Sequence, residues 1–145
     1  MKKANFSVKI NAPKEKVWET LWNDKTYREW TSAFSEGSYA VSDWKEGSKV
    51  LFMGPDGGGM FSKIAKLEPN TYMSFQHLGE LKEGQEQPAN EKTESWAGMH
   101  ENYRLTEADG GTELNVDMDA TEEFQEYLKS RFPKALEKVK EIAER

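Results

Sequence analysis

The pattern that most constrains the fold lies in the C-terminal segment of the chain. Apolar residues recur there three or four positions apart, the spacing of one helix face; they are Phe124, Leu128, Phe132, Ala135, Leu136, Val139 and Ile142. Pro133 interrupts this stripe. Because an interior proline removes a helix hydrogen bond, we expect a kink near Arg131–Phe132 or a new helix that begins there and runs to Ala143. A long helix with one apolar face has to bury that face against another element.

The middle of the chain predicts a sheet for that helix to pack on. Strand patterns separated by turn residues are expected at 38–44, 48–54, 59–68, 70–79, 96–106 and 112–120. At the start of the chain, Phe6, Val8 and Ile10 alternate with polar residues and predict a further strand. Most of the segment 79–95 is polar and aperiodic after Leu81, which predicts a mobile loop.

Two short helices are expected between the first strand and the others. Pro13 suits the first turn of one helix, whose apolar face would carry Val17, Trp18, Leu21 and Trp22. Asp24 can cap the second helix, in which Tyr27 and Trp30 face the same way. The whole order predicts one α+β domain over residues 1–145. In it, an antiparallel sheet of about six to seven strands curves around the long C-terminal helix and leaves a gap beside it.

Composition narrows the class of protein. The chain has 26 acidic and 20 basic residues, a net charge of −6, without a basic stripe, so no nucleic-acid partner is expected. It contains no cysteine, which excludes disulfides, thiolate catalysis and cysteine-bound zinc. The start, MKKANFSVKI, has no long apolar run, and the mean hydropathy is −0.89. We therefore expect a cytoplasmic protein without a signal peptide or membrane insertion.

Four segments carry a resemblance to a known superfamily. They are INAPKEKVWETLWNDKTYREW at 10–30, KLEPNTYMSFQHLGE at 66–80, GGTELNVDMDA at 110–120 and FPKALEKVKEIAE at 132–144. Together they resemble the START, or SRPBCC, helix-grip superfamily. Within it they are most similar to the bacterial subfamily homologous to the C-terminal domain of the heat-shock protein 90 ATPase activator. The superfamily includes lipid carriers, hormone receptors, polyketide cyclases and co-chaperones. The resemblance therefore implies the fold, and it implies either a ligand or a chaperone as partner.

Glu101 is the most informative polar residue. One side of the strand predicted at 96–106 would carry Ala97, Met99, Glu101, Tyr103 and Leu105, and of these only Glu101 is charged. A carboxylate on an apolar face is costly unless it is paired or neutralised. Glu101 is therefore either an anchor for a ligand or acid–base group, or a structural residue that is ion-paired or lies at the cavity mouth.

His77 shares its strand face with Met73 and Phe75, so it is also expected to point inward. It is either a satisfied core histidine or the partner of Glu101 in an acid–base or ligand-orienting pair. The other histidine, His100, has the opposite parity to Glu101, so no metal site is expected. The run Gly54–Gly59 lacks the Gly-Lys-Ser/Thr ending of a phosphate loop and is read as a hairpin turn. No catalytic residue and no cofactor is assigned.

The leading prediction is reversible binding of a small hydrophobic or aromatic molecule between the sheet and the C-terminal helix. The candidate ligand-binding residues are Trp30, Phe34, Phe75, His77, Met99, Glu101, Tyr103 and Phe132. The aromatic members have core packing as their alternative role. The second prediction is a protein-interaction module of the chaperone ATPase-activator type, although no exposed apolar run along the chain offers a surface for it. A cyclase-like enzyme comes third.

Overall fold

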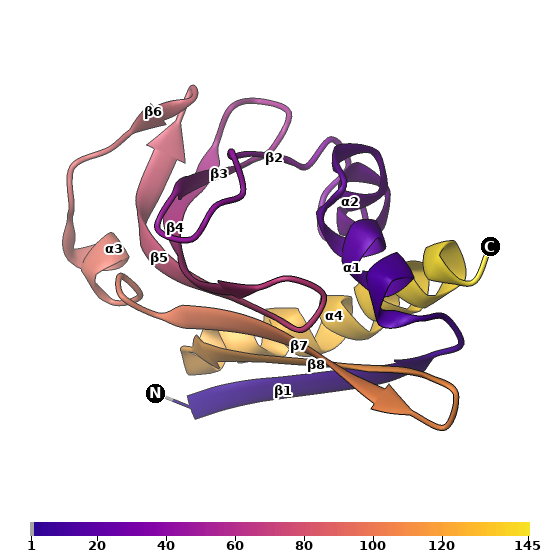
Figure 1. Ribbon diagram of the computed structural model, residues 1–145. Helices are drawn as coiled ribbons and strands as arrows, with labels where there is room; N and C mark the ends of the chain where they lie inside the picture. The colour runs from indigo at the N-terminus through magenta and orange to yellow at the C-terminus, as the bar shows by residue number, and fades with distance from the viewer. Residues whose placement is uncertain (1) are drawn as a thin grey trace.

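The computed structural model describes residues 2–145 and has the predicted order of elements (Figure 1). The strands are β1 (Lys2–Ile10), β2 (Tyr39–Val41), β3 (Lys49–Met53), β4 (Gly59–Glu68), β5 (Tyr72–Lys82), β6 (Gln85–Glu86), β7 (His100–Ala108) and β8 (Gly111–Ala120). The helices are α1 (Lys14–Trp22), α2 (Asp24–Thr31), α3 (Glu91–Glu94) and α4 (Glu122–Ala143). No helix within residues 2–145 is both long and apolar enough to cross a membrane.

The strands form one antiparallel sheet in the order β1-β8-β7-β5-β4-β3-β2, and β6 pairs with β5. This confirms the predicted antiparallel sheet, which has eight strands where about six to seven were expected. The hairpin between β7 and β8 turns at Asp109 and Gly110, whose φ angles are 45° and 82°. Positive φ at both central positions is the requirement of a type I′ turn, which explains the Asp-Gly pair there.

The sheet curves around α4, as expected of a helix-grip fold (Figure 1). α4 packs mainly on β1 and on the two short helices α1 and α2. Six members of its predicted apolar stripe are buried, namely Leu128, Phe132, Ala135, Leu136, Val139 and Ile142. Phe124, the first member, is exposed, because it lies in the opening turn of the helix.

The expectation of a separate helix from Phe132 is wrong, since α4 is one helix from Glu122 to Ala143. Pro133 lies on its exposed side. The carbonyl of Lys129, four residues earlier, therefore loses its usual partner where water can replace it. At its start, the side chain of Thr121 caps the helix by accepting from the backbone N–H of Phe124.

The prediction of an unstructured loop over 79–95 is wrong in part. β5 continues to Lys82, β6 follows, and α3 forms at Glu91–Glu94. Asn90 and Thr93 make a reciprocal capping box, in which each side chain accepts from the other residue's backbone N–H. The polar residues that suggested a loop thus include the signals that start a short helix.

Candidate functional site

Four side chains form a connected line of hydrogen bonds across the sheet. The hydroxyl of Ser62 lies 2.7 Å from Nδ1 of His77, and Nε2 of His77 lies 3.2 Å from Oε1 of Glu101. The hydroxyl of Tyr103 donates to the other carboxylate oxygen, Oε2. We call Ser62, His77, Glu101 and Tyr103 the polar chain. His77 and Glu101, which the sequence could not place relative to each other, therefore meet.

Strand register brings the polar chain together. Ser62 on β4 pairs directly with His77 on β5, and Phe75 on β5 pairs with Glu101 on β7. Alternate residues of a strand share a face, so His77 joins Phe75 and Tyr103 joins Glu101 on one side. The pairing of β4 with β5 slips at Leu78, which is left without a partner between His77 and Gly79. Bulges of this kind are frequent beside functional sites, where they redirect a side chain.

Both ends of the polar chain are buried, and its two middle residues are partly exposed to solvent. Ser62 and Tyr103 are buried, whereas the side chains of His77 and Glu101 keep 12% and 18% of their exposure. Burial raises the pKa of the Tyr103 phenol well above its usual value, and the negative charge of Glu101 raises it further. The same two causes raise the pKa of Tyr27 on α2. Both phenols therefore stay protonated at neutral pH, and Tyr103 remains a donor.

Aromatic rings adjoin the polar chain. The Phe75 ring centroid lies 5.3 Å from that of Trp22, 6.4 Å from Trp44, 5.1 Å from Phe52 and 6.2 Å from Tyr103. We call these five residues the aromatic cluster. Phe75 meets each of the other four rings edge to face, the arrangement that aromatic quadrupoles prefer. The cluster reaches the polar chain twice, through Tyr103 itself and through Phe52, whose ring lies 6.2 Å from His77.

Trp44 is the strained member of the aromatic cluster. It sits between β2 and β3 with φ at 58°, a left-handed conformation that a bulky residue rarely adopts. Its backbone N–H donates to the Ser42 hydroxyl at 3.0 Å, and its ring packs on Trp22 and Phe75. Such strain costs about 1–3 kcal/mol and concentrates at functional sites. Trp44 is also only partly buried, so among the cluster it is well placed to move.

The two hollows described for residues 2–145 lie away from the polar chain. One hollow, of about 380 Å³, lies between the start of α1 and the β7–β8 turn. The other, of about 140 Å³, lies over β1 and β8 around Phe6 and Val116. Neither is lined by the polar chain or the aromatic cluster. The aromatic cluster packs directly on the polar chain, so a molecule that binds between the two has to displace side chains.

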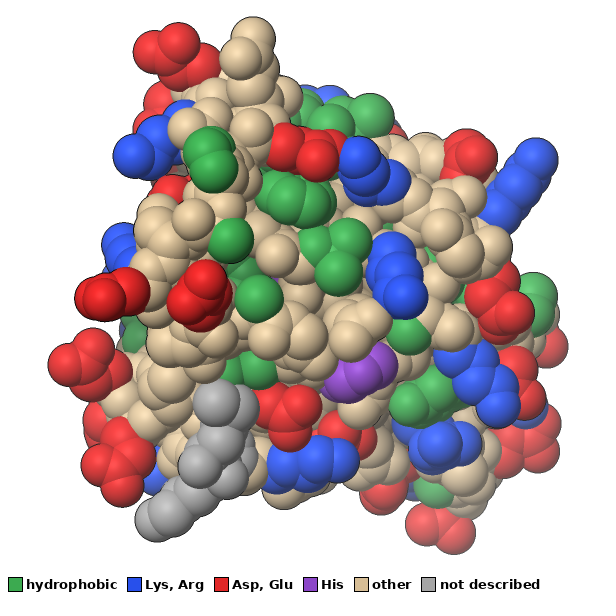
Figure 2. Space-filling view, turned by 90° about the vertical axis from the view of Figure 1, so that its left-hand side faces the viewer, with side chains coloured by type: hydrophobic (Ala, Val, Ile, Leu, Met, Phe, Trp, Pro, Cys, Tyr) green, Lys and Arg blue, Asp and Glu red, His purple; other side chains and the backbone are tan. Residues whose placement is uncertain are grey.

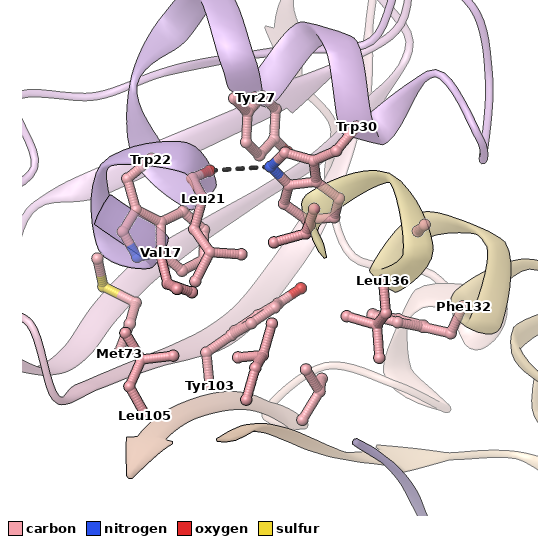
Figure 3. Close-up of a cluster of buried hydrophobic side chains, with 14 of the residues drawn as sticks. Val17, Leu21, Trp22, Tyr27, Trp30, Met73, Tyr103, Leu105, Phe132 and Leu136 are labelled. Carbon is pink, nitrogen blue, oxygen red and sulfur yellow. Dashed lines mark hydrogen bonds between the residues drawn. The ribbon is translucent and has the colours of Figure 1, made fainter. Parts of the chain in front are cut away.

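The structure separates the candidate ligand-binding residues into groups. Phe75, His77, Glu101 and Tyr103 lie together. Trp30 packs on Tyr27, and its indole N–H donates to the carbonyl of Leu21 at 3.1 Å (Figure 3). Phe34 meets Phe132 edge-on at 5.0 Å, and Phe132 stacks on Phe6 at 4.9 Å. Met99 is buried just before β7 but is not part of the main core cluster.

Four residues of this region were absent from the predicted site: Ser62, Trp22, Trp44 and Phe52. Ser62 alternates with Ile64 on β4, and that parity could have placed its hydroxyl on the inner face. His100 points to the opposite side from Glu101, as predicted, where its Nδ1 lies 3.4 Å from the Ser74 hydroxyl. Among residues 2–145, no three histidine, aspartate or glutamate side chains are grouped to hold a metal ion.

An antiparallel sheet that curves around a long C-terminal helix, with two short helices after the first strand, defines a helix-grip domain. The family described as "Activator of Hsp90 ATPase homolog 1-like protein" matches residues 11–144, and the chain belongs to that family. This membership confirms the resemblance found in the sequence. It supports, in general terms, a ligand-binding domain or one of the Hsp90 ATPase-activator type.

Solved structures support the same fold. The Aha1 dimer from Colwellia psychrerythraea is 22% identical, with a TM-score of 0.76, and the match covers 99% of this chain and 97% of that one. Protein MLL2253 from Mesorhizobium loti is 17% identical, with a TM-score of 0.76 and coverage of 97% and 96%. An AHSA1-like protein from Aeromonas hydrophila is 17% identical, with a TM-score of 0.69 and coverage of 99% and 92%. At these identities the likeness concerns the fold alone. No curated protein matches the chain in sequence.

Proposed function

We propose that this protein reversibly binds a small hydrophobic or aromatic molecule between the inner face of the sheet and its helices. The observation that carries the proposal is the polar chain, a connected set of polar groups beside an aromatic cluster. Ligand sites of small molecules have this composition, with mostly apolar and aromatic walls and a few converging polar groups.

Stability alone does not account for the polar chain. Apolar residues of similar volume usually stabilise a core as well as a buried ionic group does, or better. The protein nevertheless has an acidic residue, Glu101, and a histidine, His77, on the inner face of the sheet. The same face carries the apolar side chains of Met73, Phe75 and Leu105. The side chains of His77 and Glu101 are partly exposed, which supports a role for them in contact with an entering molecule.

Indole resonances offer a direct test of this proposal. The chain has five tryptophans, of which Trp22 and Trp44 belong to the aromatic cluster, and Trp96 lies outside it in the turn before β7. We would titrate the protein with a library of small aromatic compounds and record its ¹H–¹⁵N spectra. We expect saturable shifts of the Trp22 and Trp44 indole signals, with the Trp96 signal unmoved. A library without such a compound, or with shifts only at Trp96 and the outer face, would contradict ligand binding on the inner face.

A second candidate function, interaction with a chaperone, is favoured by an apolar row on the other face of the sheet. Val41, Leu51 and Phe61 are paired across β2, β3 and β4, and the Phe61 ring covers Gly79 on β5. Val41 is 48% exposed. Leu51 and Phe61 are partly buried. The row forms across strands and not along the sequence, so a search for an exposed apolar run along the chain does not find it.

The basic side chain of Lys49 borders this row, which we call the outer apolar row. The Lys49 ammonium lies 5.8 Å from the centre of the Phe61 ring and is also paired with Glu86. Figure 2, which faces the side of the molecule where β5 and β6 lie, shows hydrophobic side chains near the middle of the surface with lysine or arginine side chains beside them. An apolar surface with a charged border is typical of a protein-interaction site.

The chaperone function is tested with purified bacterial Hsp90. We expect the wild-type protein to bind it and raise its ATPase rate, and Val41→Glu to weaken both effects. Phe124→Glu is the matched control, because Phe124 is similarly exposed at 45% but lies on α4, away from the outer apolar row. Equal effects of both substitutions, or no binding by the wild-type protein, would remove this candidate.

A further inference from the structure

The indole nitrogen of Trp22 is a buried donor without an acceptor. It is one of two buried side-chain nitrogen or oxygen atoms in residues 2–145 that make no hydrogen bond, and the Trp22 side chain is only 9% exposed. Buried polar groups nearly always have partners, and each exception calls for an explanation. Trp30, nearby, shows the usual solution, since its indole N–H donates to the carbonyl of Leu21 (Figure 3).

The position of Trp22 connects this donor with the proposed ligand site. Trp22 is the last residue of α1, and its ring lies 5.0 Å from Tyr103, 5.3 Å from Phe75 and 5.8 Å from Trp44. In Figure 3 the Trp22 nitrogen lies at the edge of the ring that is drawn toward Met73. The ring that carries the unpartnered N–H therefore belongs to the aromatic cluster, and it packs directly on Tyr103 of the polar chain.

We propose that the ligand carries a neutral acceptor oxygen, such as that of a ketone, ester or ether, which accepts a hydrogen bond from Nε1 of Trp22. This inference rests on the proposed ligand-binding function and specifies the ligand's chemistry. A purely hydrocarbon ligand would leave the donor unsatisfied, whereas an acceptor removes that cost on binding. The oxygen is neutral because the cluster adjoins the carboxylate of Glu101, which already uses both of its oxygens for His77 and Tyr103. A second negative charge near this carboxylate would be repelled.

Two probes of similar shape test this assignment: benzophenone, which has a carbonyl oxygen between its rings, and diphenylmethane, which has a methylene group there. We would titrate each into the wild-type protein and follow the Trp22 indole ¹H–¹⁵N signal, assigned through its nuclear Overhauser contacts to Phe75 and Tyr103. We expect benzophenone to move the indole proton downfield, the direction of a new hydrogen bond, and diphenylmethane not to do so. This measurement needs no substitution, so it remains decisive if variants of the buried Trp22 fail to fold.

Substitution gives a second readout. We define the preference as the Kd of diphenylmethane divided by that of benzophenone, which cancels the difference in hydrophobicity when two proteins are compared. Trp22→Phe removes the donor and keeps a ring, so we expect the preference to fall about tenfold, the effect of one hydrogen bond to a buried donor. Trp96→Phe is the control and should leave the preference unchanged.

The outcomes separate this inference from the function on which it rests. If both probes bind the inner face but the preference is the same in wild type and Trp22→Phe, the acceptor assignment is overturned and ligand binding stands. A Trp22 signal that shifts identically with both probes has the same meaning. If neither probe moves any signal of the aromatic cluster, ligand binding itself loses its support, and the acceptor assignment falls with it.

Discussion

Replacing Tyr103 by phenylalanine removes one atom from the polar chain and tests whether its hydrogen bond stabilises the fold. The Tyr103 side chain is buried, and its hydroxyl donates to the Glu101 carboxylate. The ring of the variant can keep its contacts with Trp22 and Phe75, so the packing change is small. A hydrogen bond to a charged group is worth about 1.5–3 kcal/mol. Because Glu101 keeps His77 and some access to water, we expect a loss at the lower end, about 1.5 kcal/mol.

For a domain of this size, that loss corresponds to a decrease in Tm of about 3–6 °C. The assay is urea unfolding at neutral pH followed by far-ultraviolet circular dichroism, with thermal unfolding as a second measurement. Tyr72→Phe is the matched control. Tyr72 lies on the same sheet under the Arg104 guanidinium, and its hydroxyl makes no hydrogen bond within residues 2–145. Its loss should change stability by less than about 0.5 kcal/mol. Equal stabilities of the Tyr103 and Tyr72 variants would refute the assigned bond.

The pH dependence of the free energy of unfolding, compared between wild type and Tyr103→Phe, gives an independent check. The pKa of Tyr103 is raised in the folded state, mainly by burial. In the unfolded chain it titrates near pH 10, so the unfolded state loses its proton first. The stability associated with the neutral phenol is therefore complete below about pH 10 and declines as pH rises beyond it. We expect this alkaline decline to be shallower in Tyr103→Phe, with the remainder due in part to Tyr27, whose pKa is also raised.

Three further substitutions examine the site and the helix. Trp44→Ala should leave room for a free aromatic molecule, so added indole should raise the Tm of this variant more than that of wild type. An equal rise in Tm for both proteins would argue against an accessible space on the inner face. Pro133→Ala should leave the free energy of unfolding unchanged or raise it by up to about 1 kcal/mol, because the continuous α4 can then form the missing bond to Lys129; a loss of more than about 2 kcal/mol would show that the proline fits a required bend. Glu101→Gln should lower stability by about 1 kcal/mol in urea unfolding, because neutral hydrogen bonds to His77 and Tyr103 replace charge-assisted ones; a gain would show that the charge is poorly compensated.

Elements with a local signal were predictable from the sequence. The strand at 59–68 has the expected bounds, and the inner face of β7 carries Glu101, Tyr103 and Leu105 as its alternation indicates. Both features depend on neighbouring residues, whose period and turn chemistry can be read directly. The start of α3 was missed, although its capping residues are local, because a polar segment with one short helix has too little apolar periodicity to be distinguished from a loop.

The contacts of the site depend on pairings between distant parts of the chain. Ser62 meets His77 only because β4 and β5 pair in one register, with a slip at Leu78 that no local pattern announces. The Trp22 ring packs on Tyr103, which lies 81 positions later in the sequence. Sequence alternation therefore selected the correct inner-facing residues of β5 and β7, but it could not say which of them touch.

The arrangement of the polar chain implies that its members act together. Glu101 is held from both sides, by His77 and by Tyr103, and His77 is held in turn by Ser62. Removing any one of them takes a hydrogen-bond partner from its neighbour, so the contributions of the four residues to stability are coupled. The polar chain therefore fixes the orientation of Glu101 and His77. The Trp22 donor is not held in this way. On the inner face, the side chains of the polar chain already have hydrogen-bond partners, whereas the indole N–H of Trp22 has none. Of these groups, only the Trp22 donor would gain a hydrogen bond from a molecule that carries an acceptor.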